Sequence, residues 1–361
     1  MRPETEAELA EIVTGLSDPV RIAGGGTRGV GGSDPVLSVA GLQGITLYEP
    51  GALTVVARSG TPLAEIEATL EAEGQQLAFE PMDHRGLLGT MGEPTIGGVV
   101  AANISGPRRI QTGACRDFLL GVRYIDGRGQ VIKNGGRVMK NVTGYDLVKL
   151  MAGSWGTLGV LSEVSLKVLP KPEAQATLAL DVPDARAAVG VMSAALKSPY
   201  EVSGAAYDPA QNQAFLRIEG FADSVAYRID RLRETLGGGA DRSDMCWADI
   251  RDARAFHDLE GDLWRLSVKP GDAPDIAARA GAERLLFDWG GGLIWALMPK
   301  GTDLRPRLGD FEGHATLVRA DEGTMDKLGR FQPESALIQA LTKGIRQRFD
   351  PRGVFNPGLM G

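Results

Sequence analysis

Apolar and polar positions follow two different periods along this chain. Apolar residues at intervals of three and four predict helices over residues 3–16, 61–75, 145–151, 184–197, 224–236, 272–280 and 334–349. Short apolar or alternating runs predict strands over residues 20–23, 36–39, 53–60, 159–169, 176–182, 202–207, 213–219, 263–268, 284–289, 293–299 and 314–319. Residues 118–133 are typical of a hairpin with Asp126-Gly127 in its turn.

The ends of two predicted helices carry residues that suit those positions. Thr61 is expected to be the N-cap of helix 61–75, with Pro62 at its first position and Gly74 at its C-terminal end. Asp350-Pro351 stops the last helix, because a proline disfavours helical backbone in the residue before it.

A domain boundary is predicted at residues 169–175, where two prolines follow an apolar strand. The order that follows is strand, helix, strand, strand, helix, which is most of a split β-α-β unit. A similar order of strands and helices then recurs over residues 263–319. We therefore expect residues 176–320 to form an antiparallel sheet built from two related halves.

Charge and cysteine content exclude several classes of protein. The formal net charge is −7 without a basic run, which is unfavourable for nucleic-acid binding. Cys115 and Cys246 stand alone, so we expect no disulfide framework and a reduced, cytoplasmic protein. The acidic start does not resemble a signal peptide, and no apolar run reaches the ~18–20 residues that span a bilayer. Membrane contact would then be peripheral or through a partner.

Glycine is the unusual residue of this sequence, with 49 among 361 where an average usage of roughly 7% predicts about 25. Gly24, Gly26 and Gly29 follow an apolar run and match the dinucleotide fingerprint G-x-G-x-x-G. That fingerprint needs a helix to begin inside the motif, so that a pyrophosphate lies at the helix N-terminus. More glycines and Pro35 follow instead. Inside a helix, each glycine would destabilise it by about 1 kcal/mol and a proline by about 3 kcal/mol. The Rossmann interpretation therefore fails.

The better interpretation is an extended loop whose successive backbone N–H groups form an anion nest. Glycines allow positive φ angles there and let a phosphate approach closely. Thr27 and Arg28 would add a hydroxyl donor and a positive charge. The alternative is an ordinary glycine-rich turn.

Two further segments, residues 93–109 and 140–172, keep side chains small where a flat ligand or another backbone must pass. Tight packing of a sheet on itself would explain either one alone. Other stretches accompany them in a fixed order: SGTPLAEIEATLEAEGQ, RDFLLGVRYIDGRG, FDWGG, GHAT and FDPRGVFNPG. With the glycine loop, they make nearly the whole chain resemble the FAD-linked oxidases of the vanillyl-alcohol oxidase and p-cresol methylhydroxylase (PCMH) type.

This resemblance implies an α+β fold with three parts. Residues 1–172 would form a PCMH-type FAD-binding domain of two α/β subdomains. Residues 173–330 would form an antiparallel-sheet α+β cap domain, and residues 331–361 a C-terminal helix and tail that return to the FAD domain.

The resemblance also implies which residues bind FAD. In the family, the glycine loop wraps the pyrophosphate, the segment matching Pro81 and residues 95–102 runs along the isoalloxazine and ribityl groups, and residues 156–160 match the approach to the adenine side. The implied cofactor-binding residues are Gly24, Gly25, Gly26, Thr27, Arg28, Gly29, Pro81, Thr95, Ile96, Gly97, Gly98, Ala101, Ala102, Gly156, Gly159 and Val160.

Three residues are candidates for catalysis. Asn356 matches a tail that returns near the flavin ring, although a plain turn after the last helix fits it equally well. His314 matches the start of a metal-binding loop in related 2-hydroxy-acid dehydrogenases, and it is either an acid/base or a structural loop histidine. Arg108, in the pair Arg108-Arg109, is either an anion contact for substrate or FAD or a solvated or interface residue.

A metal site and a covalent flavin link are both expected to be absent. The chain has three histidines and no Glu-His pair, whereas a catalytic metal usually takes three protein ligands. Residues 20–32 contain neither His nor Cys, and His84 and Cys115 match no attachment motif. FAD is therefore expected to be bound non-covalently.

The activity implied by the resemblance is an FAD-dependent oxidation of the CH–OH group of 2-hydroxy acids. The chain would be the FAD-binding subunit of a glycolate-oxidising complex, beside a larger FAD-binding subunit and an iron–sulfur subunit. It would either oxidise glycolate to glyoxylate or serve as an electron-relay or assembly subunit. Its expected location is the cytoplasm, with peripheral contact at the inner membrane through the complex. The alternatives are a stand-alone FAD-dependent oxidoreductase acting on another 2-hydroxy acid or alcohol, and a non-redox nucleotide-binding module.

Overall fold

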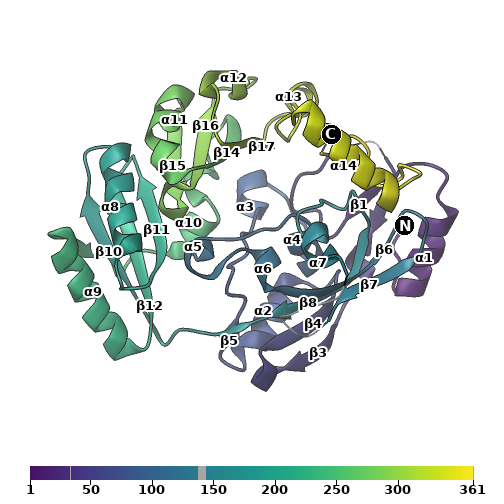
Figure 1. Cartoon of the computed structure of the whole chain (residues 1–361), viewed down its shortest axis with the longest axis horizontal. Helices are drawn as coiled ribbons and strands as arrows, with labels where there is room; N and C mark the ends of the chain where they lie inside the picture. The colour runs from purple at the N-terminus through teal and green to yellow at the C-terminus, as the bar shows by residue number, and fades with distance from the viewer. Residues whose placement is uncertain (33, 137–143, 361) are drawn as a thin grey trace. The chain divides into compact units, whose positions relative to one another are not determined.

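The computed structural model describes residues 1–32, 34–136 and 144–360 of the chain (Figure 1). Residues 140–143, the start of one segment that carries the family resemblance, lie outside the described residues. The chain divides into two compact units. Unit 1 comprises Met1–Ser105, Ala114–Lys171 and Pro333–Gly361, and unit 2 comprises Gly106–Gly113 and Pro172–Gln332. The short segment Gly106–Gly113 thus groups with unit 2, whereas the prediction placed it in the first domain.

Unit 1 is built around a five-stranded antiparallel sheet in the order β3-β4-β8-β6-β7. The strands are β3 (Ile45–Glu49), β4 (Thr54–Arg58), β8 (Val160–Lys167), β6 (Leu119–Ile125) and β7 (Val131–Gly135). Two small sheets accompany it: β1 (Arg21–Ala23) with β2 (Val36–Ser38), and β5 (Gln75–Gln76) with β9 (Leu169–Pro170). β1 and β2 are parallel, so the glycine loop is the connection between two parallel strands.

Helices precede, connect and follow the strands of unit 1. They are α1 (Glu6–Gly15), α2 (Leu63–Glu71), α3 (Arg85–Leu88), α4 (Ile96–Ala101), α6 (Cys115–Phe118), α7 (Leu147–Met151) and α14 (Ala336–Phe349), with 3-10 turns η1 (Val39–Gly41) and η2 (Pro50–Ala52). α2 begins at Leu63 with Pro62 as its N-cap, so the prediction of Thr61 as N-cap was wrong. The Thr61 hydroxyl instead donates to the carbonyl of Arg58 and accepts from the amide of Gly44.

Unit 2 is one antiparallel sheet of eight strands in the order β13-β10-β12-β11-β15-β16-β14-β17. The strands are β10 (Ala174–Asp181), β11 (Val202–Asp208), β12 (Gln213–Gly220), β13 (Ala240–Asp241), β14 (Asp262–Val268), β15 (Arg284–Asp288), β16 (Leu293–Met298) and β17 (Gly313–Arg319). Strands β11 and β15 join the two halves through the register pair Tyr207–Phe287. The predicted antiparallel sheet is therefore confirmed.

Helices pack on the sheet of unit 2, with α8 beside β11 and α9 beside β10 (Figure 1). The helices are α5 (Arg109–Thr112), α8 (Ala185–Lys197), α9 (Ala222–Leu236), α10 (Trp247–Arg251), α11 (Ala273–Ala280), α12 (Arg305–Leu308) and α13 (Glu322–Leu328), with 3-10 turns η3 (Arg254–Phe256), η4 (Pro270–Asp272) and η5 (Trp289–Gly291). An apolar cluster between sheet and helices lies in the core of this unit. In the described part of unit 1, a large cluster lies on the five-stranded sheet, and a smaller one places Val354 and Phe355 of the tail among residues of α1, β1 and β8.

Candidate functional site

The glycine loop forms part of the wall of a cavity of about 330 Å³ in unit 1. Residues 21–30 supply one side of the cavity. The rest comes from Val39 and Ser59, from α4 and the residue after it, from residues 154–161 around the beginning of β8, and from the tail near Asn356. Segments far apart in the sequence therefore meet at one cavity.

The backbone of the loop is open for an anion. The N–H groups of residues 24–28 donate no hydrogen bond within the described part of the chain, and all five residues line the cavity. Gly26 and Gly29 have φ angles of 70° and 58°, which glycine adopts without strain. A Cβ atom on Gly25 would lie 1.5 Å from the carbonyl oxygen of Glu93, so glycine is required there for close packing. The predicted nest has a physical basis in these unpaired donors.

Two arginines supply positive charge to the cavity wall. Burial lowers the pKa of Arg28 to about 10, although Cys115 and Asp83 oppose this shift. The Nε atoms of both Arg21 and Arg28 are buried without a hydrogen-bond partner in the described chain, and no ion pair with Arg28 occurs there. Desolvated guanidinium groups without a carboxylate partner are costly unless a ligand neutralises them. This donor set fits the pyrophosphate of a dinucleotide such as FAD.

The start of α4 approaches the cavity closely because its first residues are small. Thr95 caps the helix by accepting from the amide of Gly98. A Cβ atom on Gly97 would lie 2.6 Å from the Cβ atom of Ser59, and one on Gly98 would lie 2.7 Å from an Nη atom of Arg28. The Ser59 hydroxyl is buried, lines the cavity and has no hydrogen-bond partner in the described chain, so it is a further donor for a ligand.

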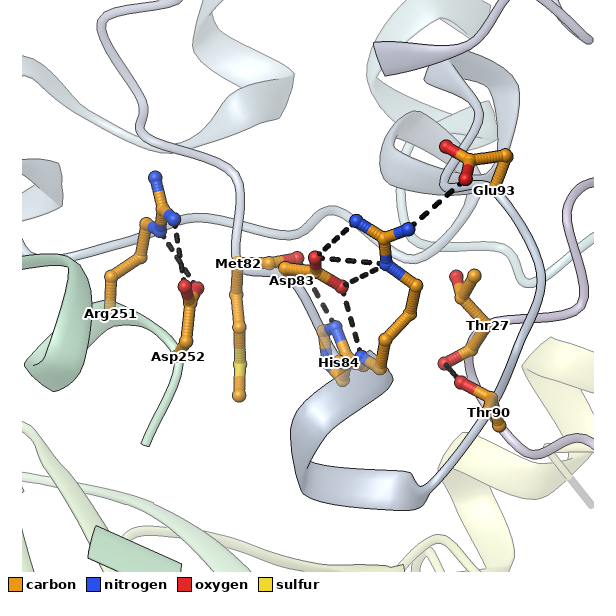
Figure 2. A network of polar contacts seen from close by, with 9 residues as sticks. Thr27, Met82, Asp83, His84, Thr90, Glu93, Arg251 and Asp252 are labelled. Atoms are coloured by element: carbon orange, nitrogen blue, oxygen red, sulfur yellow. Dashed lines mark hydrogen bonds and ion pairs between the residues drawn. The ribbon is translucent and has the colours of Figure 1, made fainter. Parts of the chain in front are cut away.

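A polar network behind the loop fixes its position (Figure 2). Thr90 donates from its hydroxyl to the carbonyl oxygen of Thr27 over 3.2 Å. The guanidinium of Arg85 donates three hydrogen bonds to Asp83, and its backbone amide donates a fourth. The same guanidinium contacts Glu93 over 3.2 Å. Burial raises the pKa of Asp83, but its hydrogen bonds with Arg85 outweigh this, and the net effect lowers it. Asp83 is therefore an ionised anchor at neutral pH.

Asn356 ties the tail to the cavity. Its side-chain oxygen accepts from the amide of Ile22 over 2.7 Å, and its side-chain nitrogen donates to the carbonyl of Trp155 over 2.7 Å. Asn356 has a φ angle of 42°, which asparagine tolerates better than most residues. Both polar ends of this side chain are occupied by backbone groups, so its role in the described structure is to position the cavity wall.

Most of the predicted cofactor-binding residues gather at this cavity. Those that line it are Gly24, Gly25, Gly26, Thr27, Arg28, Gly29, Gly97, Gly98, Ala101, Ala102, Gly156, Gly159 and Val160. Pro81, Thr95 and Ile96 are buried and are not part of the lining in the described chain. Sequence reasoning missed Arg21, Ser59, Ser154 and Trp155, which also line it. None of these four residues belongs to a glycine motif. Only Arg21, a basic residue in the short run before the glycine loop, could have been predicted from the sequence as an anion contact.

The other two catalytic candidates, Arg108 and His314, both lie in unit 2, but they are far apart. Arg108 is buried, and its guanidinium contacts the carboxylate of Glu219 on β12 over 2.5 Å. His314 is exposed on β17 and pairs in register with Ser267. Five strand spacings separate β12 from β17, or about 24 Å at ~4.8 Å per spacing. The structure therefore does not bring Arg108 and His314 to one site.

Neither a metal-binding cluster nor a membrane-spanning helix occurs among the described residues. Within residues 1–32, 34–136 and 144–360, no group of three or more His, Cys, Asp or Glu side chains could hold a metal ion. No helix in that part of the chain is long and apolar enough to cross a membrane.

Comparisons with known proteins agree with the chemistry of the cavity. Residues 1–135 match the family described as an FAD binding domain. The chain resembles solved structures of alkyldihydroxyacetonephosphate synthase, one of them with a TM-score of 0.71 at 15% identity over 100% of this chain and 77% of that one. At that identity the likeness shows the fold alone.

Two kinds of relative are similar in sequence. Glycolate oxidase subunit GlcD of Bacillus subtilis (strain 168) is 33% identical over 49% of this chain and 38% of that protein, and D-lactate dehydrogenase of Anaerostipes hadrus is 32% identical over 48% and 36%. The chain thus spans little more than a third of these longer relatives. Glycolate oxidase subunit GlcE of Escherichia coli (strain K12) is 39% identical over 99% of this chain and 97% of that protein. The chain therefore belongs to the GlcE family of FAD-linked oxidoreductases, and its cofactor is FAD.

Proposed function

We propose that this protein is the FAD-binding subunit of a glycolate-oxidising complex, with the cavity of unit 1 as the place where it holds FAD. The observation that carries the proposal is the run of five unpaired backbone N–H groups beside Arg28. Similarity to GlcE along almost the whole chain supports the choice of complex.

Each part of the cavity has a distinct task in this proposal. The N–H groups of residues 24–28 donate to the pyrophosphate, and Arg28 balances its charge. The Ser59 hydroxyl offers one more donor, and Asn356 holds β1 against residue 155 so that the wall keeps its shape. When bound, FAD supplies the two-electron acceptor for oxidation of a 2-hydroxy acid to a 2-oxo acid.

The partners in this proposal are a larger FAD-binding subunit and an iron–sulfur subunit. The similarity to GlcE and GlcD, which are both subunits of glycolate oxidase, supports a multi-subunit assembly. The chain has two cysteines, whereas an iron–sulfur cluster normally takes four protein ligands. Electrons that leave the flavin of this subunit would thus pass to a cluster on another chain.

The first experiment asks whether FAD is present and how it is held. The purified protein should show a flavin absorbance spectrum, and acid denaturation should release the yellow chromophore into the supernatant. Colour retained on the precipitate would contradict non-covalent binding. A colourless protein that takes up no added FAD would overturn the proposal.

The second experiment asks which reaction the flavin serves. The isolated, FAD-loaded protein is mixed with glycolate without oxygen, and the flavin absorbance is followed. Prompt bleaching means that this subunit oxidises glycolate itself. If glycolate alone causes no bleaching, the larger subunit is added. Bleaching that exceeds the amount of flavin on the larger subunit then means that electrons reach the flavin of this subunit.

A stand-alone oxidoreductase for another 2-hydroxy acid is the second candidate, because D-lactate dehydrogenase is also among the relatives. The same assay with D-lactate separates the two functions. Bleaching by D-lactate but not by glycolate would favour this candidate, as would purification from the native source without other subunits.

A further inference from the structure

The last helix of unit 1, α14 (yellow in Figure 1), presents its apolar side to solvent. None of its residues, all of which are described, is buried. α8 and α9 have similar lengths, and each buries a row of side chains. On α14, the four large aliphatic side chains are exposed by 71, 41, 57 and 39%, in the order Leu337, Ile338, Leu341 and Ile345. Spacings of three and four positions place them on one side of the helix.

The C-terminal end of α14 is anchored in unit 1. Phe349 packs against the core of the five-stranded sheet, and its ring centroid lies 6.3 Å from that of Tyr124. The guanidinium of Arg346 donates to the carbonyl of Leu359. Residues 336–345, in contrast, are exposed apart from the half-buried Thr342. A helix of this length is marginally stable in water unless its apolar side is packed, so a covering surface would stabilise it.

A row of small residues runs beside the large ones. Ala336, Ala340 and Gly344 are spaced by four positions, and all three are exposed. A Cβ atom on Gly344 would have no neighbour within 4 Å, so the space over this row is open. A ridge of large side chains beside a groove of small ones is the surface on which another helix packs closely. The polar side carries Gln339 and Lys343, which is little charge for a helix that binds membrane surfaces.

This surface is complementary to a second copy of itself. If two α14 helices run antiparallel and cross at Leu341, Ile338 of each copy faces Gly344 of the other, and ridge meets groove on both sides of a two-fold axis. The same register places Arg348 of each copy beside Glu334 of the other, because these residues lie seven positions after and before Leu341. Both are exposed, and neither forms an ion pair in the described chain.

We propose that α14 is a dimerisation helix, which packs antiparallel against α14 of a second copy with Leu341 at the two-fold axis. The exposed aliphatic side chains are then removed from water, and the two pairs of Arg348 with Glu334 fix the register. α14 is about 21 Å long, and one face of such a helix is smaller than the ~800 Å² per partner of a standard interface. The dimer is therefore weak, with a dissociation constant on the order of 10 μM.

Sedimentation equilibrium of the FAD-loaded protein over a concentration series measures this constant. Leu341→Asp places two carboxylates at the axis and should weaken the dimer more than about tenfold. Gly344→Leu fills the groove and should weaken it about tenfold, although leucine favours a helix more than glycine does. A role of Gly344 within its own copy alone would predict no such loss.

A charge swap tests the register. Arg348→Glu and Glu334→Arg should each weaken the dimer about 5–10-fold, because like charges then meet at both ends. The double variant should restore the wild-type constant. These two positions are about 21 Å apart along one chain, so a rescue reports a contact between copies. Lys343→Glu makes the same change in net charge on the opposite side of α14, and it should dimerise like the wild type.

The inference is overturned if the wild type stays monomeric up to about 300 μM, if Leu341→Asp dimerises normally, or if the double swap restores nothing. A monomeric wild type that instead binds the larger subunit, or vesicles containing phosphatidylserine, and loses this binding in Leu341→Asp would assign the face to that partner and would also refute the dimer. Flavin content and bleaching by glycolate are measured separately, so failure of the proposed function is visible on its own.

Discussion

Asn356 is a single side chain that joins three distant segments of unit 1. It binds the amide of Ile22 and the carbonyl of Trp155, and its own amide donates to the carbonyl of Val20. It is 5% exposed, so solvent does not replace a bond that is lost.

Replacing Asn356 should therefore destabilise the protein. We expect Asn356→Ala to cost about 2–3 kcal/mol in the free energy of unfolding, because two partly buried backbone groups lose their hydrogen bonds with this side chain. Urea unfolding measures this. Asn212 has a φ angle of 52° but is exposed, so Asn212→Ala is the matched control and should cost only a few tenths of a kcal/mol. Equal losses would mean that backbone conformation, and not hydrogen bonding, explains the effect.

Arg28 should contribute to FAD affinity through its charge. Arg28→Gln is expected to weaken FAD binding about tenfold and to make the affinity less sensitive to salt, because a phosphate contact is lost. Fluorescence titration of the apoprotein with FAD at two salt concentrations measures both quantities. Arg58 is exposed on β4, and Arg58→Gln should leave the FAD affinity unchanged. A similar loss in both variants would argue against a specific contact.

For single residues, how much the sequence could predict depends on whether the interacting residues are close together or far apart in the chain. Gly25 is needed because of a backbone approach, and such a requirement leaves glycine in the sequence itself. The bond between Asn356 and Ile22 crosses 334 positions, and no local pattern reports it. Ser59 is a small polar residue directly after the strand β4, and only the folded chain shows that it lines the cavity.

At the scale of elements, an ion pair supports the junction between the halves of the eight-stranded sheet. Asp208 at the end of β11 binds Arg284 at the start of β15 through two hydrogen bonds, at 2.5 and 2.8 Å. The two strands share one register pair, so this contact reinforces a sparse junction. Burial raises the pKa of Asp208, but its bonds with Arg284, Gln211 and Ala210 outweigh this and lower it overall.

The lowered pKa of Asp208 predicts a pH dependence of stability. Because the carboxyl is more acidic in the folded state, its contribution is complete above the unfolded value of about 3.9 and is lost as pH falls through the folded value. Asp208→Asn should cost roughly 3 kcal/mol at pH 7 and progressively less below about pH 4. Urea unfolding at several pH values tests this. Asp244→Asn, which alters an exposed pair with Arg242, should change little at any pH.

Most of the longer elements followed the apolar pattern, while their ends depended on neighbours. The pattern predicted neither β3 nor α4, the glycine-containing helix that lines the cavity. The helix after Thr61 exists as predicted, yet its cap was misplaced because Gly44 and Arg58 compete for the threonine hydroxyl. Tertiary contacts of this kind override a local preference for capping. The two-residue strands β5 and β9 gave no signal, because an alternation needs more residues than they have.

At the scale of the whole molecule, each unit has apolar clusters of its own, and the cavity that we propose for FAD is lined by residues of unit 1. A ligand stabilises only the cooperative unit that binds it. We expect FAD to raise the unfolding temperature of unit 1, with about 2.7 kcal/mol gained at 100 times its dissociation constant. Scanning calorimetry with and without FAD measures this.

Hydrogen exchange supplies the control for that prediction. Amides of β1, β4 and β8 should become more protected when FAD is added, while those of β10, β11 and β12 should exchange at unchanged rates. Equal added protection in both units would show that they unfold as one.

The construction of unit 1 from three stretches of chain has a consequence for biosynthesis. The tail is tied to the beginning, with Val20 donating to Val354, Asn356 bonded to Ile22, and Arg352 donating to carbonyls of α1 and the residue after it. A ribosome releases α1 and β1 first and the residues near 356 more than 330 positions later. Unit 2 can complete its sheet before the last partners of β1 have been made. FAD would therefore be enclosed only at the end of synthesis, and a nascent chain halted before residue 350 should not retain it.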